Sequence, residues 1–226
     1  MTVYIGGAIM GGRGSGSGLK QSDGPRGGGG GDTKWNQPNT PQMRPPAPNI
    51  RGVIGAKGKP ISATQAVKSI NPFRDAEYGD YSENCQRCVV AFELNRRGYK
   101  VEAEATWEND TYPRGNHWMS AFKGGKLEDV GARNTAAVNK NILSKMGSWG
   151  EGSRAIVKVQ YPGGNSGHVF NVEYHRGKLY YYDAQTGVSY KNRTVFDHVV
   201  KGNVQIVRSD NLDIADNVRD MVRKRR

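Results

Sequence analysis

Three residues of this chain have the side chains needed for nucleophilic attack by sulfur, and each stands in a suitable local context. Cys85 begins the segment 84–98, in which apolar residues recur with the period of a helix and a glycine closes the run. His168 begins an alternating segment typical of a strand, and Asp183 ends the next one. A cysteine at a helix start, with a histidine and a carboxylate on a neighbouring hairpin, is the arrangement that nucleophilic thiol chemistry needs.

The roles follow from the chemistry of each group. A cysteine attacks as the thiolate, which a helix N-terminus and an adjacent imidazolium both favour. We therefore expect Cys85 to attack, His168 to transfer the proton, and Asp183 to orient the imidazole. Gln185 and Asn84 are the candidates for contacting the substrate or its carbonyl oxygen. The alternative interpretation is that Cys85 is an ordinary buried helix residue and His168 a hydrogen-bonded strand histidine.

The hairpin that carries the histidine and the aspartate allows a geometric argument. If residues 176–177 form a two-residue turn, Phe170 lies opposite Asp183. His168 and Asp183 are then diagonal neighbours on one face, with Cα atoms about 7 to 8 Å apart, within reach of a hydrogen bond. A shift of the register by one residue would place them on opposite faces.

Cys88 is the rival nucleophile, but it lies one turn further into the helix, where fewer free amides face it. A Cys-x-x-Cys pair is also typical of zinc sites and thiol redox sites. Zinc needs two more ligands at suitable spacing, and the histidines are scattered along the chain: His117, His168, His175 and His198. Redox chemistry of the thioredoxin type needs the pair after the first strand of a βαβ unit. We therefore expect no metal and no cofactor.

The remaining elements follow from periodicity and from helix-capping residues. The pattern predicts further helices over 61–70, 134–146 and 211–223, with Asn134 as an N-cap. It predicts strands over 99–105, 154–160, 168–174, 178–183 and 203–208. Because helices precede and follow a mainly antiparallel sheet, the expected fold class is α+β.

Composition divides the 226-residue chain into three parts. Residues 1–60 are rich in glycine and proline and carry 8 Lys or Arg against 2 Asp, so we expect a disordered basic arm. Residues 61–222 hold 21 basic and 19 acidic residues and form the expected domain, and 223–226 form a basic tail. A domain so close to neutral does not resemble a nucleic-acid reader, although the arm and tail are able to bind nucleic acid or another polyanion.

The chain shows no apolar stretch long enough to cross a bilayer and no signal peptide at its start. We expect a soluble protein, made in the cytoplasm. Two cysteines three apart make no disulfide framework, which fits free thiols in a reducing compartment.

Three sequence blocks, 84–98, 167–173 and 182–187, resemble in order and spacing the signature blocks of the papain-fold toxin family of glutamine deamidases. That family occurs in bacterial polymorphic toxins and prophage-encoded proteins. The resemblance implies a papain-like fold, with a catalytic helix packed on a mainly antiparallel sheet. It also implies a catalytic cysteine at Cys85, a histidine at His168 and an aspartate at Asp183.

The functional hypothesis is a cysteine hydrolase that forms a thioester, with deamidation of a protein glutamine favoured by the resemblance. A cysteine protease of the same fold is the first alternative, because the two reactions differ in the pocket and not in the catalytic residues. The second is a phage virion-associated structural or binding protein whose arms hold a phage partner or nucleic acid. An effector delivered from a virion would combine both roles.

Overall fold

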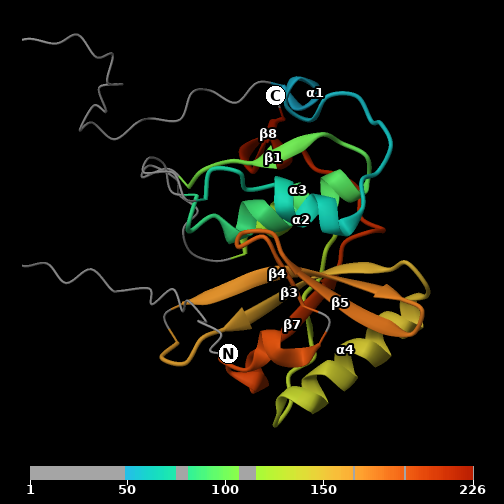
Figure 1. Ribbon diagram of the computed structural model, residues 1–226, viewed down its shortest axis with the longest axis vertical. Coiled ribbons are helices and arrows are strands. Elements are labelled where there is room, and N and C mark those ends of the chain that lie inside the picture. Colours follow the sequence, from blue (N-terminus) through green and yellow to red (C-terminus); the bar gives the residue numbers. More distant parts are fainter. Residues whose placement is uncertain (1–48, 75–80, 107–115, 165, 191, 226) are drawn as a thin grey trace, which may run out of the picture. The chain divides into compact units, whose positions relative to one another are not determined.

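The computed structural model describes residues 49–225, apart from 75–80, 107–115, 165 and 191. Most of the expected disordered arm, residues 1–48, and the last residue of the expected basic tail lie outside the described residues. The described part is a mixture of helices and antiparallel strands (Figure 1). The α+β class predicted from the sequence is confirmed.

A six-stranded antiparallel sheet forms the centre of the fold, in the order β2-β7-β3-β4-β5-β6. Its strands are β2 (Glu128–Asp129), β3 (Arg154–Gln160), β4 (Gly167–His175), β5 (Lys178–Asp183), β6 (Val188–Tyr190) and β7 (Gln205–Arg208). A separate two-stranded antiparallel sheet joins β1 (Val101–Ala103) to β8 (Val222–Lys224).

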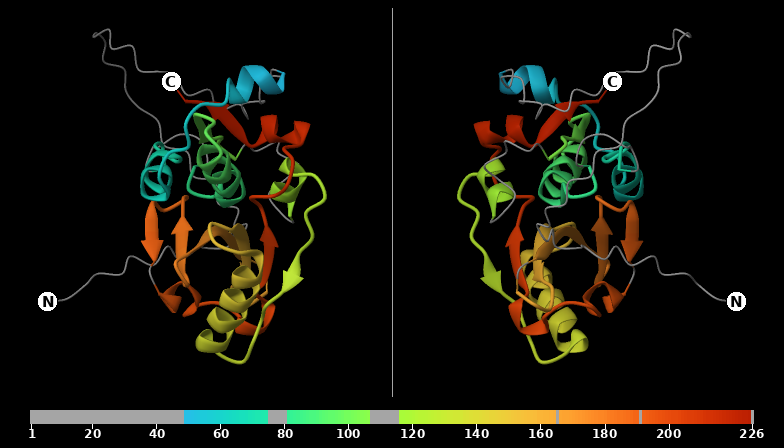
Figure 2. Two further views of the ribbon diagram at one scale, coloured as in Figure 1. Left: turned by 90° about the vertical axis from the view of Figure 1, so that its right-hand side faces the viewer. Right: turned by 90° about the vertical axis from the view of Figure 1, so that its left-hand side faces the viewer.

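Helices cover both faces of the large sheet, as the two side views show (Figure 2). The helices on one face are α2 (Ala63–Ser69) and α3 (Cys85–Arg96), with α1 (Ile50–Ile54) beyond them, and α4 (Thr135–Trp149) covers the other. Four short 3₁₀ helices complete the described part: η1 (His117–Ala121), η2 (Arg193–Phe196), η3 (Lys201–Asn203) and η4 (Asp216–Asp220).

The two faces of the sheet bury two separate apolar clusters because successive strand residues point to opposite sides. On β5, Tyr182 packs with Phe92 of α3, whereas Tyr181 packs with Phe170 and Phe196 in the cluster beneath α4. Neighbouring tyrosines of one strand thus pack on opposite faces of the sheet.

Helix α3 is buried along most of its length, including Glu93, whose side chain is 0% exposed. The Glu93 carboxylate accepts hydrogen bonds from the guanidinium groups of Arg97 and Arg154 and from the Ser209 hydroxyl. These contacts tie α3 to the start of β3 and to the chain after β7. The C-terminal half of α3 is thereby held in a fixed position relative to the sheet.

The β4–β5 turn has the geometry expected from the sequence. Arg176 has φ 49° and Gly177 φ 74°, the two positive values that a type I′ hairpin turn requires. Asn171 pairs with Tyr182, and His175 pairs with Lys178. The predicted two-residue turn and its register are therefore confirmed.

Two boundaries of the domain differ from the sequence-based expectation. The domain was expected to begin at residue 61, but α1 lies before that point, buries Val53 and Ile54, and packs against β8. Asn49 caps it by accepting a hydrogen bond from the Gly52 amide. Glycine and proline around this short helix concealed the burial of two β-branched residues.

At the other end, the helix predicted over 211–223 is wrong. The chain forms the short helix η4 and then strand β8, in which Val222 is buried opposite Ala103. Arg223 and Arg225 of the expected basic tail lie beside Glu102 of β1. Strand pairing and these charge contacts outweigh the helical pattern, because tertiary burial commonly overrides local propensity.

The C-terminal end of one further helix also differs from expectation. Helix α4 begins as predicted, with Asn134 accepting from the Ala137 amide, but it continues through Gly147 to Trp149. Gly150, with φ 96°, then follows as the C-cap.

Within the described ranges, no helix is long and apolar enough to span a membrane.

Candidate functional site

The imidazole of His168 and the carboxylate of Asp183 are hydrogen-bonded at the edge of the β4–β5 hairpin. His168 Nε2 lies 3.0 Å from Asp183 Oδ2, and both side chains are nearly buried, at 13% and 10% exposed. The His168 ring packs beside Phe170 on the same strand, with ring centroids 6.1 Å apart. Because Nε2 is occupied by Asp183, Nδ1 is the ring nitrogen that remains for a third group.

That third group is Cys85, the first residue of α3. Burial by itself lowers the pKa of His168, but the Asp183 charge and hydrogen bond, together with a hydrogen bond and charge interaction with Cys85, raise it well above its usual range. Cys85 is half-buried, whereas Cys88 is buried. The structure therefore brings the thiol, imidazole and carboxylate together from α3, β4 and β5.

Asp183 is held as a carboxylate. Burial raises its pKa, but His168 and hydrogen bonds from Thr186 outweigh this effect and lower it. Its Oδ1 accepts from the backbone amides of Gln185 at 3.1 Å and Thr186 at 3.4 Å. The turn after β5 thus fixes the carboxylate, which in turn fixes the imidazole.

Cys88 stands in a different environment from Cys85. It is 1% exposed, and its Sγ donates to Asn84 Oδ1 at 3.2 Å. Burial, followed by the nearby Cys85 and Asp183, raises the pKa of the Cys88 thiol well above its usual range. A buried, protonated thiol that serves as a donor is a poor nucleophile.

Asn84, one of the two candidates for contact with the substrate, is 1% exposed and already fully bonded. Its Nδ2 donates to Asn71 Oδ1 and to the Glu104 carbonyl. Both amide protons are therefore used within the protein. This arrangement favours a structural role at the start of α3 over contact with a substrate oxygen.

Gln185, the other candidate, is half-buried, and its Nε2 donates to the carbonyl of Ser82. The contact joins the turn after β5 to the segment that precedes the Cys85 helix. Its second amide proton has no partner among the described residues. Gln185 thus bridges two parts of the site and retains one donor.

Asn71, which directly follows the helix predicted over 61–70, is a residue of this site that the sequence does not single out. Its Nδ2 lies within hydrogen-bonding distance of the Tyr81 carbonyl, Asn84 Oδ1 and the Gln185 carbonyl, at 2.9, 3.3 and 3.1 Å. One side chain therefore links the segments before Cys85 and after Asp183. The sequence gives no signal for it, since Gln185 is 114 positions away.

The backbone at the start of α3 provides a further feature. The amides of Arg87 and Cys88 donate to the Asn84 carbonyl, at 2.9 and 3.0 Å. Among the described residues, those of Cys85 and Gln86 have no acceptor, as is usual in the first turn of a helix. They are donors available beside the Cys85 sulfur.

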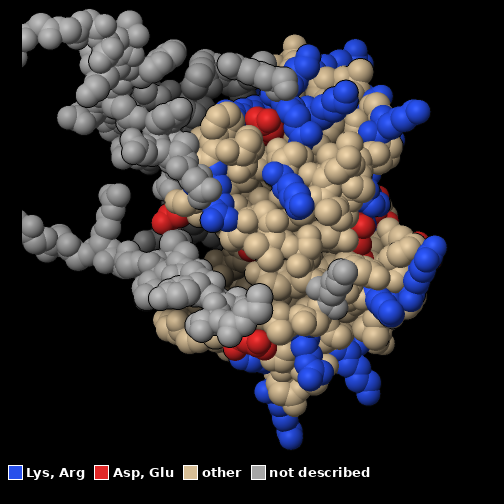
Figure 3. Space-filling model, viewed as in Figure 1, with Lys and Arg blue, Asp and Glu red and all other residues tan. Residues whose placement is uncertain are grey.

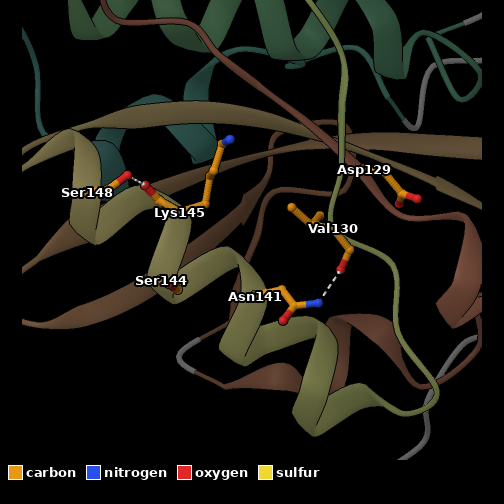
Figure 4. A pocket seen from close by; sticks show the side chains of 6 residues that line it. All are labelled: Asp129, Val130, Asn141, Ser144, Lys145 and Ser148. Carbon is orange, nitrogen blue, oxygen red and sulfur yellow. Dashed lines mark hydrogen bonds between the residues drawn. The ribbon is translucent and has the colours of Figure 1, made fainter.

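Two pockets lie apart from these residues. The first, about 340 Å³, lies between α4 and the chain around β2 and is drawn with its lining residues in Figure 4. Asn141 partly fills it by donating to the Val130 carbonyl. The second, about 550 Å³, lies at the C-terminal ends of α3 and β4, beside the Arg96–Glu173 ion pair. Neither is lined by Cys85, His168 or Asp183.

Among the described residues, no group of three or more His, Cys, Asp or Glu is placed to hold a metal ion.

Comparison with known proteins gives three results. No curated protein matches the chain. A solved structure, a variant of the Salmonella effector SpvD, is similar with a TM-score of 0.46 and 18% sequence identity, over 68% of this chain and 80% of that one. Residues 83–188, which include Cys85, His168 and Asp183, match the family described as papain fold toxin 1, glutamine deamidase. This segment, a little under half of the chain, is therefore similar to the papain-fold toxin family of the glutamine deamidase type.

Proposed function

We propose that the chain is a cysteine hydrolase that deamidates a glutamine side chain of a protein, with Cys85 as nucleophile, His168 as acid and base, and Asp183 as the orienting carboxylate. The observation that carries the proposal is the hydrogen bond between His168 Nε2 and Asp183 Oδ2, with Cys85 close enough to contribute to the raised pKa of His168. The family match supports the choice of a glutamine amide. A role as a toxin or effector is part of the same proposal.

The reaction is balanced in two steps. The Cys85 sulfur bonds to the side-chain carbonyl carbon of glutamine, and the His168 imidazolium gives its proton to the departing nitrogen, which leaves as ammonia. A water molecule then attacks the thioester, with His168 accepting its proton, and glutamate and the free thiol are formed. Asp183 keeps Nδ1 of the ring directed at the sulfur throughout.

Charge develops on the carbonyl oxygen of the tetrahedral intermediates. The Cys85 amide, at the first position of α3, is the proposed donor to that oxygen, because it has no acceptor among the described residues. Gln185 is the proposed second donor, through its remaining amide proton. Asn84 positions the helix start rather than the substrate.

The experiment uses the full chain with glutamine-containing proteins and peptides as substrates. Ammonia release with an intact substrate chain, and conversion of one glutamine to glutamate by mass spectrometry, is the expected result. The Cys85→Ala variant should release none. Cleaved substrate chains without converted glutamine would instead identify a protease, and no reaction with thiol-directed amide probes would exclude a cysteine hydrolase.

A further inference from the structure

Lys and Arg side chains gather at the end of the domain formed by α1 and β8 (Figure 3), and six exposed basic residues belong to these elements or to the segments beside them. This basic face consists of Arg51, Lys57, Lys59, Lys68, Lys100 and Lys224. None of the six makes a side-chain hydrogen bond or ion pair with the described residues. All six charges are therefore available to a partner.

Backbone contacts hold the segments that carry these charges side by side. The Gly58 amide, between Lys57 and Lys59, donates to the Gly98 carbonyl at 2.8 Å. Lys224 lies opposite Val101 in the β1–β8 pair, next to Lys100. The Arg225 guanidinium donates to Ser69, the neighbour of Lys68. The six charges thus belong to one surface of the fold.

Acidic groups are nearly absent from this surface. Residues 49–74 contain no Asp or Glu. Glu102 on β1 is 14% exposed and already faces Arg223 and Arg225. In the sequence, much of the positive charge lies in the segments 1–60 and 223–226. The fold places Arg51, Lys57 and Lys59 of the first segment and Lys224 of the second on this face.

The basic face approaches the candidate site through α2. Lys68 is on α2, and a Cβ placed on Gly187 would lie 3.8 Å from the carbonyl oxygen of Val67. Gly187 ends the turn that follows Asp183, whose Oδ1 anchors the turn. A protein large enough to cover that turn while a glutamine enters at Cys85 therefore extends toward Lys68.

We propose that the basic face binds an acidic surface of the protein whose glutamine is deamidated, and so selects the substrate. This inference rests on the proposed function. Complementary charges at the rim of an interface increase the rate of encounter and discriminate against wrong partners, and their effect falls as salt rises. The specificity of the enzyme then comes partly from a surface outside the catalytic pocket.

The side chains present favour an acidic protein over a nucleic acid or a membrane. Single-stranded nucleic acids bind to aromatic side chains on which bases stack, and peripheral membrane binding uses exposed apolar residues. The described large apolar residues that are exposed are Phe73 and Val188. Phe73 is covered by the Arg223 guanidinium, 4.6 Å from its ring centre. Neither belongs to the basic face, which offers charge alone.

The test compares two fourfold charge reversals in the full chain. The first changes the face: Lys57→Glu, Lys59→Glu, Lys100→Glu and Lys224→Glu. The matched control changes exposed lysines elsewhere on the domain: Lys123→Glu, Lys126→Glu, Lys140→Glu and Lys178→Glu. Both variants alter the net charge equally, so a difference between them reports position and not total charge. Thermal unfolding verifies that each variant is folded.

Two glutamine peptides of equal length serve as probes, one with glutamates around the glutamine and one with serines in their place. For wild type and the control, kcat/KM should be about tenfold higher for the acidic peptide in low salt, and the ratio should approach one above about 0.5 M salt. In the face variant the ratio should be near one at every salt concentration. Equal values of kcat/KM for both peptides in wild type would overturn the inference while leaving deamidation intact.

Binding provides a measurement that does not depend on catalysis. In the Cys85→Ala background, the labelled acidic peptide should bind more tightly than the serine peptide, and the face reversals should weaken that binding about tenfold more than the control reversals. If neither peptide reacts with wild type but this binding pattern holds, deamidation is contradicted while binding of an acidic partner by the basic face is supported. If single-stranded DNA or phosphatidylserine vesicles bind through these lysines and the acidic peptide does not, the partner is of another class.

Discussion

His168 Nε2 lies 3.0 Å from Asp183 Oδ2 because a two-residue turn aligns β4 and β5 so that the two residues are diagonal neighbours. The Asp183 charge contributes strongly to the raised pKa of His168. The proton that the proposed reaction gives to the leaving ammonia therefore remains on the imidazole at a higher pH than in an ordinary histidine.

Replacement of the carboxylate should move the pH profile. In Asp183→Asn the pKa of His168 falls, so the imidazolium is lost at lower pH, and the alkaline limb of kcat/KM for deamidation should shift downward. The maximal kcat should fall about 1,000-fold, because the imidazole loses its orientation. The measurement is ammonia release across pH. An alkaline limb that stays in place would show that His168 does not supply the proton.

Replacement of the two cysteines should have different effects on activity and stability. Cys85→Ala should abolish labelling by an amide-based thiol probe and reduce deamidation at least about 1,000-fold. Cys88→Ala should keep the labelling and lose about 1 kcal/mol of unfolding free energy, because the hydrogen bond to Asn84 is lost in the core. Labelling is followed by mass spectrometry of the intact protein. Labelling retained in Cys85→Ala and lost in Cys88→Ala would reverse the assignment.

Asn71 should act as a positioning residue. In Asn71→Ala the links to Asn84 and Gln185 are removed, so kcat should fall while KM changes less, with a stability loss of about 1 to 2 kcal/mol. Asn141→Ala is the matched control, since it also removes an amide donor to backbone carbonyls, but in α4. It should leave kcat unchanged. A purely structural role for Asn71 would lower the unfolding free energy and leave kcat per folded molecule as in wild type.

Glu93 should be the carboxylate on which stability depends most. In Glu93→Ala, Arg97 and Arg154 lose their shared partner in a nearly buried site, and unfolding in urea should show a loss of about 3 kcal/mol or more. Glu151→Ala removes an exposed pair with His175 and should cost under about 1 kcal/mol. Similar losses of unfolding free energy in the two variants would contradict the claim that burial makes the Glu93 ion pairs more important than the exposed Glu151 pair.

Replacement of a glycine in the β4–β5 turn should have a smaller effect on stability, through backbone conformation. In Gly177→Ala a side chain is added at φ 74°, and although no atom blocks it, the backbone strain should cost about 1 kcal/mol. Gly202→Ala is the control, because Gly202 has no positive φ and no atom within 4 Å of the added carbon. It should be neutral or slightly stabilising in thermal unfolding. Equal changes in unfolding temperature in the two variants would mean that the positive φ of Gly177 does not add to the cost of the substitution.

Short-range signals in the sequence predict a large part of the structure. The helix that begins at Cys85, the N-cap at Asn134 and the β4–β5 register all follow from periods and turn residues within a few positions of one another. The hydrogen bond between His168 and Asp183 follows from the register by parity. The three family blocks lie within the matched segment 83–188.

The features that sequence reasoning missed depend on contacts between distant segments. Val222 leaves the predicted last helix because Ala103 offers a strand partner. Asn71 becomes part of the site only when the chain brings Gln185 beside it. Local preferences are weak compared with burial and pairing, so an element whose partner lies far away in the chain cannot be inferred from its own residues.

The sequence by itself determined the chemical groups, their order, and the face shared by His168 and Asp183, since a hairpin with a two-residue turn has only one register. Only the tertiary structure decided that Cys85 meets His168 while Cys88 is buried as a protonated donor to Asn84. It also placed part of the charge of both chain ends on one basic face. The physical reason is that burial and charge proximity arise from packing between α3, the sheet and β8, and no local pattern encodes them.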